Sequence, residues 1–240
     1  MQNTEWLSRT ELLIGNECLQ KLHNAHVLVV GLGGVGSYCA EFIARAGVGK
    51  MTIVDGDIVD NTNRNRQLPA TISTIGQSKA EWMSARIKDI NPEIELKVIQ
   101  TFLSPEKANE IITSDKFDYV VDAIDSVTPK LNLIIAAHRN KVKIVSSGGA
   151  GGKLDVTKIK VADLSKTHDC FLVKCIRKRL KKEKIYKGIK VVFSPETQNE
   201  KRILRTDGSN FKRSSYGTIS YMPAAFGGAC ANVVIRHIIK

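Results

Sequence analysis

The sequence predicts an α/β fold with a doubly wound, Rossmann-like, mostly parallel sheet and a basic C-terminal elaboration. Short apolar runs alternate with helical patterns through the first two-thirds of the chain, as in a parallel sheet covered by helices. The first apolar run ends in a glycine-rich loop, and the second ends in an acid. The 240 residues suit one domain, 1–240, composed of a Rossmann-like part (1–152) and the basic elaboration (153–240).

The predicted elements follow in order along the chain. Residues 9–23 form a helix before the first strand. Apolar runs predict five strands, at Val27–Val30, Met51–Val54, Glu95–Ile99, Tyr119–Val121 and Lys143–Val145. Helical patterns between them cover Gly34–Ala46, Gln77–Asn91, Pro105–Thr113 and Thr128–Asn140. In the elaboration we expect a strand near 154–161, a basic helix, a strand at 189–193, a polar loop at 194–215 and a final helix at 226–239.

The composition excludes several classes of protein. No apolar run reaches the roughly 18 residues that span a bilayer. The N-terminus, MQNTEWLSRTELLIG, lacks the cationic start and apolar core of a secretory signal. The five cysteines form no C-x-x-C pair, which argues against a disulfide framework and a structural zinc site. We therefore expect a cytoplasmic protein with reduced thiols and no membrane partner.

The positive charge is concentrated in the last third of the chain. Residues 1–150 hold 16 Lys and Arg against 17 Asp and Glu, whereas residues 151–240 hold 20 against 7. The densest stretch, Lys174–Lys190, has nine bases and one acid. It is either a solvated helix face or a binding surface for a polyanion, since neutralised phosphates release counterions. The nearby aromatic residues are either stacking platforms or core residues: Phe171, Tyr186, Phe193 and Phe211.

The glycine loop after the first strand is typical of a phosphate-binding turn. Gly31, Gly33 and Gly36 satisfy G-x-G-x-x-G, with Gly34 between them. Glycines let the backbone approach a phosphate, and the helix N-terminus supplies N–H donors. Asp55 ends the second strand, where an acid binds ribose hydroxyls. The glycine loop and Asp55 suit NAD and ATP equally well. The alternative is that the loop is a tight turn that binds no ligand.

The next block favours ATP. DGDIVDNTNRNRQ places Asp57, Asn63, Arg66 and Gln67 just beyond the ribose site, and Lys79 begins the following helix. Cleavage of a triphosphate needs fixed cations to meet the charge that builds on the bridging oxygen. A nicotinamide site has no such need. Because the chain contains no G-x-x-x-x-G-K motif, it is not a P-loop enzyme.

Two acids follow the fourth predicted strand. Asp122 and Asp125 lie in VVDAIDSVTPK, and we expect both to face the same crevice. Mg²⁺ bound to a triphosphate needs a carboxylate oxygen at such a place. One of the two acids, Asp125 in particular, is alternatively a helix N-cap.

Four motifs in this order carry a family resemblance: GxGGxGS, DxDxVxxxNxxRQ, GxxKA and DxxDS. Over residues 6–152 the chain resembles the ubiquitin-activating-enzyme-like superfamily, whose members adenylate a carboxylate with ATP. The resemblance implies that Asp55 binds the ribose, with Asp57 beside it, and that Asp125 holds Mg²⁺. It implies further that Asn63, Arg66 and Lys79 bind the phosphates. Arg9 matches an arginine that family dimers supply to the neighbouring subunit's ATP, which implies a homodimer.

The second half carries a finer resemblance. VSSGGAGGKLDVTKIKVADLSKT and the later FGGA resemble the subfamily that converts threonylcarbamoyladenosine in tRNA to its cyclic form, with ATP-dependent loss of water. The resemblance implies that the basic helix binds tRNA through Lys174, Arg177, Lys178, Lys181 and Lys182. Some relatives have a cysteine just before FGGA, where this chain reads KRSSYGTISYMP. Because the attacking carbamoyl group is tethered to the activated carboxylate, no enzyme nucleophile is needed.

The residues alone are also compatible with three other functions. The first is activation of a ubiquitin-like or sulfur-carrier protein, although Cys170 and Cys175 lack the context of an acyl-accepting cysteine. The second is a nucleotide-binding module without catalysis, and the third is a nicotinamide-dependent oxidoreductase. The residues also leave open a sulfur-relay partner and a monovalent cation near the GGAGG turn.

Overall fold

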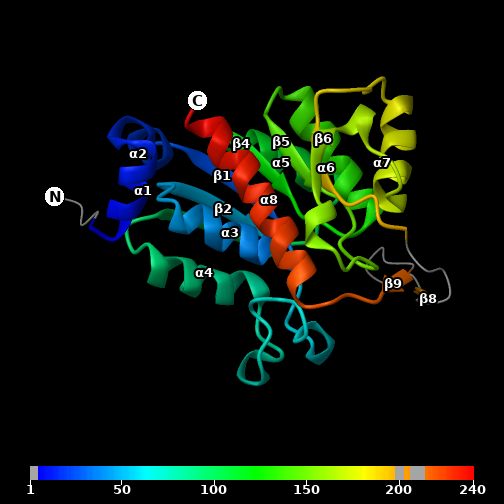
Figure 1. Ribbon diagram of the computed structural model, residues 1–240, viewed down its shortest axis with the longest axis horizontal. Coiled ribbons are helices and arrows are strands. Elements are labelled where there is room, and N and C mark those ends of the chain that lie inside the picture. Colours follow the sequence, from blue (N-terminus) through cyan, green and yellow to red (C-terminus); the bar gives the residue numbers. More distant parts are fainter. Residues whose placement is uncertain (1–4, 198–202, 206–213) are drawn as a thin grey trace.

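The protein is described here by a computed structural model that places residues 5–197, 203–205 and 214–240 (Figure 1). A seven-stranded sheet with the order β3-β2-β1-β4-β5-β7-β6 forms its centre, and every neighbouring pair is parallel except β6 and β7. The strands are β1 (His26–Val30), β2 (Lys50–Val54), β3 (Glu95–Ile99), β4 (Tyr119–Asp122), β5 (Ile144–Ser147), β6 (Lys160–Asp163) and β7 (Lys190–Phe193). The fold is therefore the predicted Rossmann-like α/β sheet.

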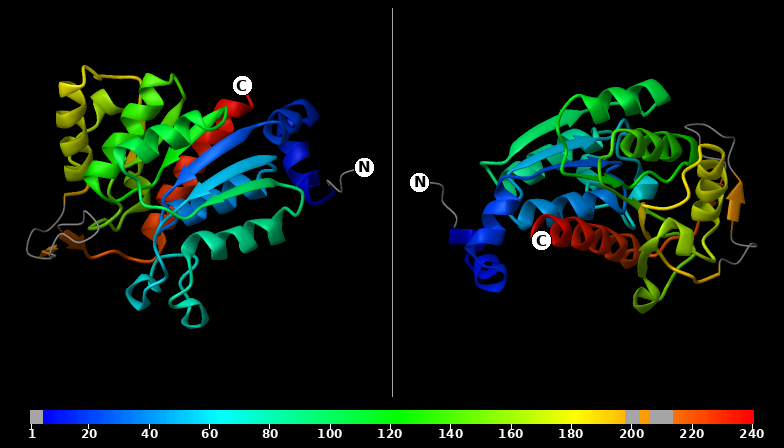
Figure 2. Two further views of the ribbon diagram at one scale, coloured as in Figure 1. Left: turned by 180° about the vertical axis from the view of Figure 1, so that it is seen from behind. Right: turned by 90° about the horizontal axis from the view of Figure 1, so that it is seen from above.

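Helices cover both faces of the sheet. One layer contains α3, α4 and α8, and the other contains α5, α6 and α7. Figure 2 shows α8 lying alongside α3. The helices are α1 (Ser8–Ile14), α2 (Asn16–His23), α3 (Gly36–Arg45), α4 (Lys79–Ile90), α5 (Pro105–Thr113), α6 (Val127–Arg139), α7 (Phe171–Lys182) and α8 (Tyr221–Ile238).

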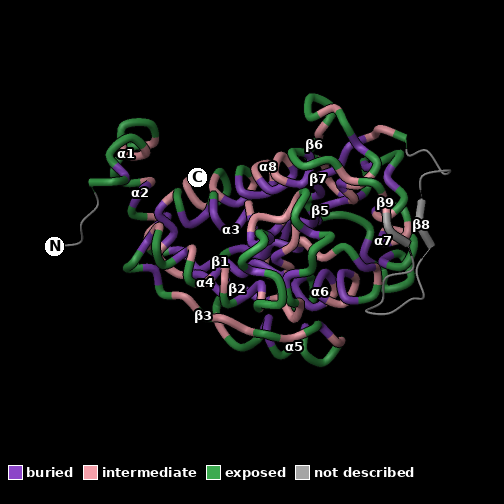
Figure 3. Tube along the Cα trace, turned by 90° about the horizontal axis from the view of Figure 1, so that it is seen from below, coloured by how far each residue is buried: buried purple, intermediate pink, exposed green. Residues whose placement is uncertain are grey.

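The central strand β1 shows why the chain adopts this arrangement. Its five residues are all buried, with Val27 and Val29 in the core beneath α3 and α8. Leu28 and Val30 point the other way, into the core beneath α5 and α6. Side chains alternate across a strand, so the run Val27–Val30, which is apolar at every position, is stable only between two covering layers. Figure 3 shows the buried residues gathered along the sheet, whereas α1 is largely exposed.

Three predicted elements differ from the observed ones. The N-terminal helix is divided into α1 and α2 by Gly15, whose φ of 80° ends the first helix. The strand expected near 154–161 begins later, at Lys160, because Asp155 caps a 3-10 turn at Val156–Lys158. The last helix begins at Tyr221 rather than 226, with Pro223 in its first turn, where proline is tolerated.

The C-terminal elaboration joins the same sheet as the Rossmann-like part. Strand β7 pairs in parallel with β5, and β6 pairs with β7 at the edge. Most of the polar stretch at 194–215 lies outside the described residues. Two described pieces of it form an antiparallel pair, β8 (Ile203–Arg205) and β9 (Ser214–Tyr216), where a loop was predicted. No helix within the described residues is long and apolar enough to cross a bilayer.

Candidate active site

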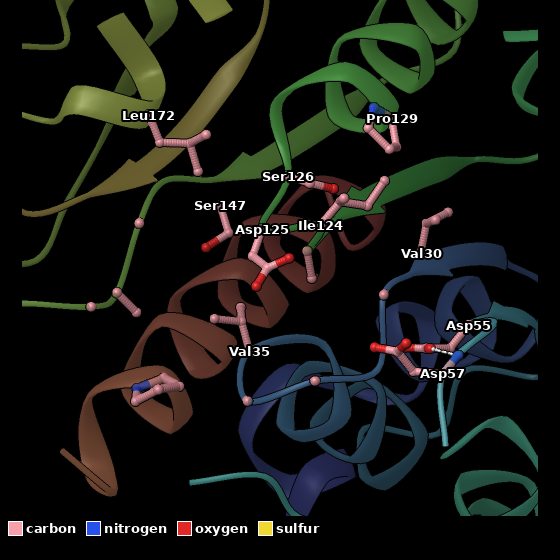
Figure 4. A pocket seen from close by; sticks show the side chains of 18 of the residues that line it. Val30, Val35, Asp55, Asp57, Ile124, Asp125, Ser126, Pro129, Ser147 and Leu172 are labelled. Atoms are coloured by element: carbon pink, nitrogen blue, oxygen red, sulfur yellow. Dashed lines mark hydrogen bonds between the residues drawn. The ribbon is translucent and has the colours of Figure 1, made fainter. Parts of the chain in front are cut away.

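A large pocket opens at the carboxyl ends of the parallel strands (Figure 4). Its volume is about 1280 Å³. It lies where the strand order reverses between β1 and β4, the point at which open α/β sheets bind their ligands. Its lining comes from both parts of the chain, from the glycine loop to Pro223 of α8. The pocket is thus placed and sized for a nucleotide together with a second substrate.

The glycine loop forms one wall of the pocket. Gly31 has a φ of 87°, and a Cβ on Gly36 would lie 1.7 Å from the Gly31 carbonyl oxygen. The loop therefore turns too tightly for any residue but glycine at position 36. Gly31, Gly33 and Gly34 line the pocket, whereas Gly36 supports the turn and begins α3. The loop residues that precede α3 therefore line the pocket at a helix N-terminus, the kind of place where phosphates bind.

Asp55 is fixed at the end of β2 by the loop itself. Its carboxylate accepts hydrogen bonds from the backbone N–H of Leu32, at 2.5 Å, and of Asp57, at 2.7 Å. Burial raises the pKa of Asp55, while these two bonds oppose that rise by favouring the charged form. The carboxylate lines the pocket beside the glycine loop, where an acid binds ribose hydroxyls.

Asn63 and Arg66 reach the pocket from the connection between β2 and α4. Asp60 caps a 3-10 turn at Asn61–Asn63, which buries Asn63. The Arg66 guanidinium donates to the Thr62 carbonyl at 2.8 Å and so is held against its own turn. Both Asn63 and Arg66 line the pocket.

Next to Arg66, Gln67 has a hydrogen-bonding atom without a partner. Its Oε1 is buried and finds no donor among the described residues. Gln67 lines the pocket, and its side-chain amide lies close to Gly33. Buried polar atoms are nearly always satisfied in native proteins. A ligand that contacts this amide would satisfy it, so Gln67 is a candidate site residue, as its place in the motif just beyond the ribose site indicated.

Lys79 supplies the buried cation of the site. It is the first residue of α4, and its side chain is only 5% exposed. Its Nζ lies 3.0 Å from Oδ2 of Asp57, whose side chain is 45% exposed. Both residues line the pocket, so this ion pair joins the connection after β2 to α4. The pair brings a fixed ammonium group to the same pocket as the glycine loop and Arg66.

The two acids after β4 have different surroundings. Asp125 is exposed and lines the pocket, and Figure 4 shows its carboxylate between the glycine loop and Ser147. The N-cap of α6 is Ser126, so Asp125 is not the N-cap. Asp122 is fully buried and does not face the crevice, so its predicted place there is wrong. Burial raises its pKa, and Lys130 opposes that rise.

Asp122 belongs to a buried network beneath the pocket. Lys130 Nζ lies 2.7 Å from Asp122 Oδ2, and Ser146 Oγ donates to the same oxygen at 2.6 Å. The Lys130 side chain, on α6, is 1% exposed. This network therefore fixes α6 and the ends of β4 and β5 to one another.

We expect Lys130→Met to lower the free energy of unfolding by about 3 kcal/mol, since it leaves a buried carboxylate without its partner. Chemical denaturation followed by circular dichroism measures this loss. The double variant Lys130→Met/Asp122→Asn should recover much of it, because no unpaired charge remains. An unchanged midpoint for Lys130→Met would show that the pair does not stabilise the fold.

The far end of the pocket is built from the turn after β5 and from the basic elaboration. The turn contributes residues 148–151, and Tyr216 and Thr218 of the elaboration lie against Gly151. The start of α7 contributes Cys170, Phe171 and Leu172, and Arg179 follows from the same helix. Arg179 was not in the predicted set, although it lies in the basic run. Arg179 lines the pocket, and the other bases of α7 do not, because of the way in which the helix is oriented.

Helix α7 presents most of the predicted RNA-binding residues to solvent. Lys174, Lys178, Lys181 and Lys182 are exposed. Arg177 is an exception: it is half-buried and donates to the backbone carbonyl and the hydroxyl of Thr167, the latter at 3.0 Å. Because that guanidinium is held by the turn before α7, we remove Arg177 from the set of RNA-facing residues.

Arg9 lies apart from this pocket. It is exposed on α1, which precedes the amino end of β1, and it does not line the pocket of its own chain. Two leucines of the same helix, Leu12 and Leu13, are 83% and 84% exposed.

The cysteines and acids do not suggest a second reactive centre. Cys39 and Cys230 are fully buried, and burial raises the pKa of Cys230 to about 12. Cys175 is half-buried on α7, while Cys170 is buried at the pocket wall. Within residues 5–197, 203–205 and 214–240, no group of three or more His, Cys, Asp or Glu side chains could hold a metal ion.

Comparisons with known proteins agree with this geometry. The sequence profile of the ThiF family matches residues 7–240. The tRNA threonylcarbamoyladenosine dehydratase of Bacillus subtilis is 39% identical over 97% of this chain and 94% of its own length. The crystal structure of Escherichia coli tRNA N6-threonylcarbamoyladenosine dehydratase in complex with ATP matches with a TM-score of 0.87 at 38% identity, covering 98% of this chain and 94% of that one. An adenylyltransferase and sulfurtransferase of Candida glabrata, UBA4, is 34% identical over 63% of this chain and 34% of its own length.

Proposed function

Because the chain belongs to the ThiF family, we propose that it is an ATP-dependent tRNA threonylcarbamoyladenosine dehydratase. One observation carries the proposal: a single pocket joins the glycine loop and the cations of the Rossmann-like part to the start of the basic helix α7. An enzyme that adenylates a group on tRNA needs both ends in one cavity.

ATP fits the residues of the nucleotide end. Asp55 would bind the ribose, with the backbone N–H groups of the glycine loop near the phosphates. Asn63, Arg66 and Lys79 would bind the triphosphate, as the family resemblance implies. The tight loop at Gly36 and the unpartnered Gln67 amide support a bound ligand here.

The proposed reaction requires the enzyme to position ATP and the modified nucleoside, and it requires no nucleophilic side chain of the enzyme. The threonyl carboxylate attacks the α-phosphate of ATP, forms an acyl-adenylate and releases pyrophosphate. The neighbouring carbamoyl group attacks the activated carbonyl carbon, closes the ring and releases AMP. The nucleoside thus loses one water in total. The tethered carbamoyl group has a high effective concentration, so the buried, high-pKa thiol of Cys230 has no role in the step.

Asp125 would hold the Mg²⁺ that accompanies the triphosphate. Its exposed carboxylate in the pocket is a donor that Mg²⁺ prefers, and Mg²⁺ usually takes only one or two carboxylates besides phosphate oxygens and waters. The ion would supply positive charge against the leaving pyrophosphate. A monovalent cation beside the turn at 148–152 stays a prediction.

The basic face of α7 would bind tRNA. Charge reversal of Lys178, Lys181 and Lys182 to Glu should weaken tRNA binding and lower the slope of log Kd against log salt by about 2 to 3. Fluorescence anisotropy at several salt concentrations measures both quantities. Affinity for ATP should be unchanged, because these side chains do not line the pocket.

A matched control reverses three exposed lysines of the Rossmann-like part, Lys107, Lys116 and Lys141. The control changes net charge equally but leaves α7 intact. Equal loss of affinity in both variants would mean that net charge, rather than the α7 face, binds the RNA.

We also propose that the protein acts as a homodimer. The exposed Leu12 and Leu13 give α1 an apolar surface for a second copy. Arg9 on the same helix would then reach the neighbouring pocket rather than its own. A sulfur-relay partner and a cytoplasmic location stay predictions.

The runner-up function is activation of a ubiquitin-like or sulfur-carrier protein. The relative with such a name matches only 63% of this chain. If the substrate were a protein tail bound in the pocket, the exposed lysines of α7 would have no anionic partner. A tRNA substrate supplies phosphates that these lysines can bind.

Mass spectrometry of tRNA nucleosides tests the proposal. Threonylcarbamoyladenosine-containing tRNA is incubated with the protein, ATP and Mg²⁺ and digested near neutral pH, which protects a cyclic product. Loss of one water, with AMP and pyrophosphate formed, is the expected result. If the nucleoside stays unchanged although the protein is folded and binds ATP, the dehydratase proposal is wrong, and activation of a carrier protein becomes the favoured function.

A further inference from the structure

The aromatic residues of the basic elaboration differ sharply in their surroundings. Phe193 is buried in β7, and Phe211 lies outside the described residues. Phe171 and Tyr186 are 64% and 57% exposed. Of these two, Phe171 lines the pocket and Tyr186 does not. A large apolar ring exposed at a pocket gains little stability from the core and is available to contact a ligand.

The orientation of α7 places Phe171 on its basic face. Val173, Ile176 and Leu180 are buried and fix the inward side of the helix. At about 100° per residue, Phe171, Lys178 and Lys182 fall within about 40° of one another on the outward side. Phe171 therefore shares a face with cations that would bind phosphates.

The same helix also has a side that faces the pocket. Leu172 and Arg179 both line the pocket and lie about 20° apart around the helix axis. This side is roughly a quarter turn from the basic face. Phe171, the first residue of α7, lines the pocket as well. Phe171 therefore lies at the boundary between the pocket and the basic face of α7.

We propose that Phe171 stacks on a nucleobase of the RNA beside the nucleoside that enters the pocket, and that Arg179 bonds an adjacent phosphate. This inference rests on the proposed function and names the groups that position its substrate. A nucleoside can reach the pocket only after leaving its base stack, which leaves a neighbouring base without a stacking partner. Aromatic side chains next to cations commonly replace that partner in single-stranded RNA.

Substitution of Phe171 gives a direct test. Phe171→Ala should raise the Kd for threonylcarbamoyladenosine-containing tRNA about 5- to 160-fold, the range for loss of one base–aromatic contact. The loss should be larger in Kd than in kcat at saturating tRNA, because Phe171 contacts a neighbouring base rather than the reacting groups. Arg179→Ala should also raise Kd, and its salt slope should fall by about 1.

Two further variants separate stacking from a general surface effect. Phe171→Trp should retain affinity, and its added fluorescence should be quenched by tRNA relative to the signal of Trp6 and Trp82 alone. Tyr186→Ala is the matched control, since it removes an exposed ring from the same basic segment away from the pocket. Its Kd should not change.

The outcomes distinguish this inference from the proposed function. Unchanged affinity of Phe171→Ala, or equal losses for Phe171→Ala and Tyr186→Ala, would overturn the stacking role while the unchanged protein still dehydrates the nucleoside. If tRNA binding depends on Phe171 but the nucleoside stays unchanged, the stacking role of Phe171 is supported and the dehydratase function is contradicted. Absence of any tRNA binding would overturn both.

Discussion

Lys79→Ala is expected to lower kcat about 100- to 1000-fold, the usual cost of removing one fixed group that stabilises charge in a transition state. The Lys79 ammonium is buried at the start of α4 and lines the pocket that contains the glycine loop. In the proposed reaction negative charge builds on the departing pyrophosphate, and the buried Lys79 ammonium would stabilise that charge without reorganisation. The assay is release of pyrophosphate in the presence of tRNA.

The fold should survive this change. Asp57 loses its partner at 3.0 Å, but its half-exposed side chain remains in contact with water. Lys107→Ala provides the control, because it breaks an exposed ion pair on α5 with Glu110. Turnover by Lys79→Ala within a few-fold of the unchanged protein would remove Lys79 from the proposed phosphate site.

Asp125→Asn is expected to lower turnover about 100-fold or more at ordinary Mg²⁺ concentrations, because the proposed metal ligand loses its charge. Excess Mg²⁺ should restore part of the activity, since the phosphate oxygens still bind the ion. The measurement is pyrophosphate release as a function of Mg²⁺ concentration.

Asp89→Asn is the matched control for the charge change. Asp89 is exposed on α4 and does not line the pocket, so its variant should titrate with Mg²⁺ like the unchanged protein. If Asp125→Asn shows the same Mg²⁺ dependence as this control, Asp125 does not hold the metal.

The nucleotide end of the pocket could be predicted from the sequence because its parts are local. The strand β1, the glycine loop and α3 follow one another without interruption, and Asp55 ends the next strand. Glycine spacing, strand pattern and helix start each constrain a few adjacent residues. The two cations, Arg66 and Lys79, and the neutral amide of Asn63 also lie in one continuous connection, so a linear motif was enough to group them.

The environment of each acid and base was decided only by tertiary contacts. Asp122 and Asp125 are three positions apart, yet one is buried against Lys130 and the other lines the pocket. Arg177 and Arg179 likewise differ because α7 turns one toward Thr167 and the other toward the pocket.

The sequence by itself determined the fold class, the tight glycine loop and the uneven charge, since these depend on composition and on neighbouring residues. The tertiary structure decided which side chains share the pocket. Phe171 reaches it only because β7 pairs beside β5 and brings α7 against α6. Such contacts join residues far apart along the chain, and burial or exposure follows from the packing of whole elements rather than from any local pattern.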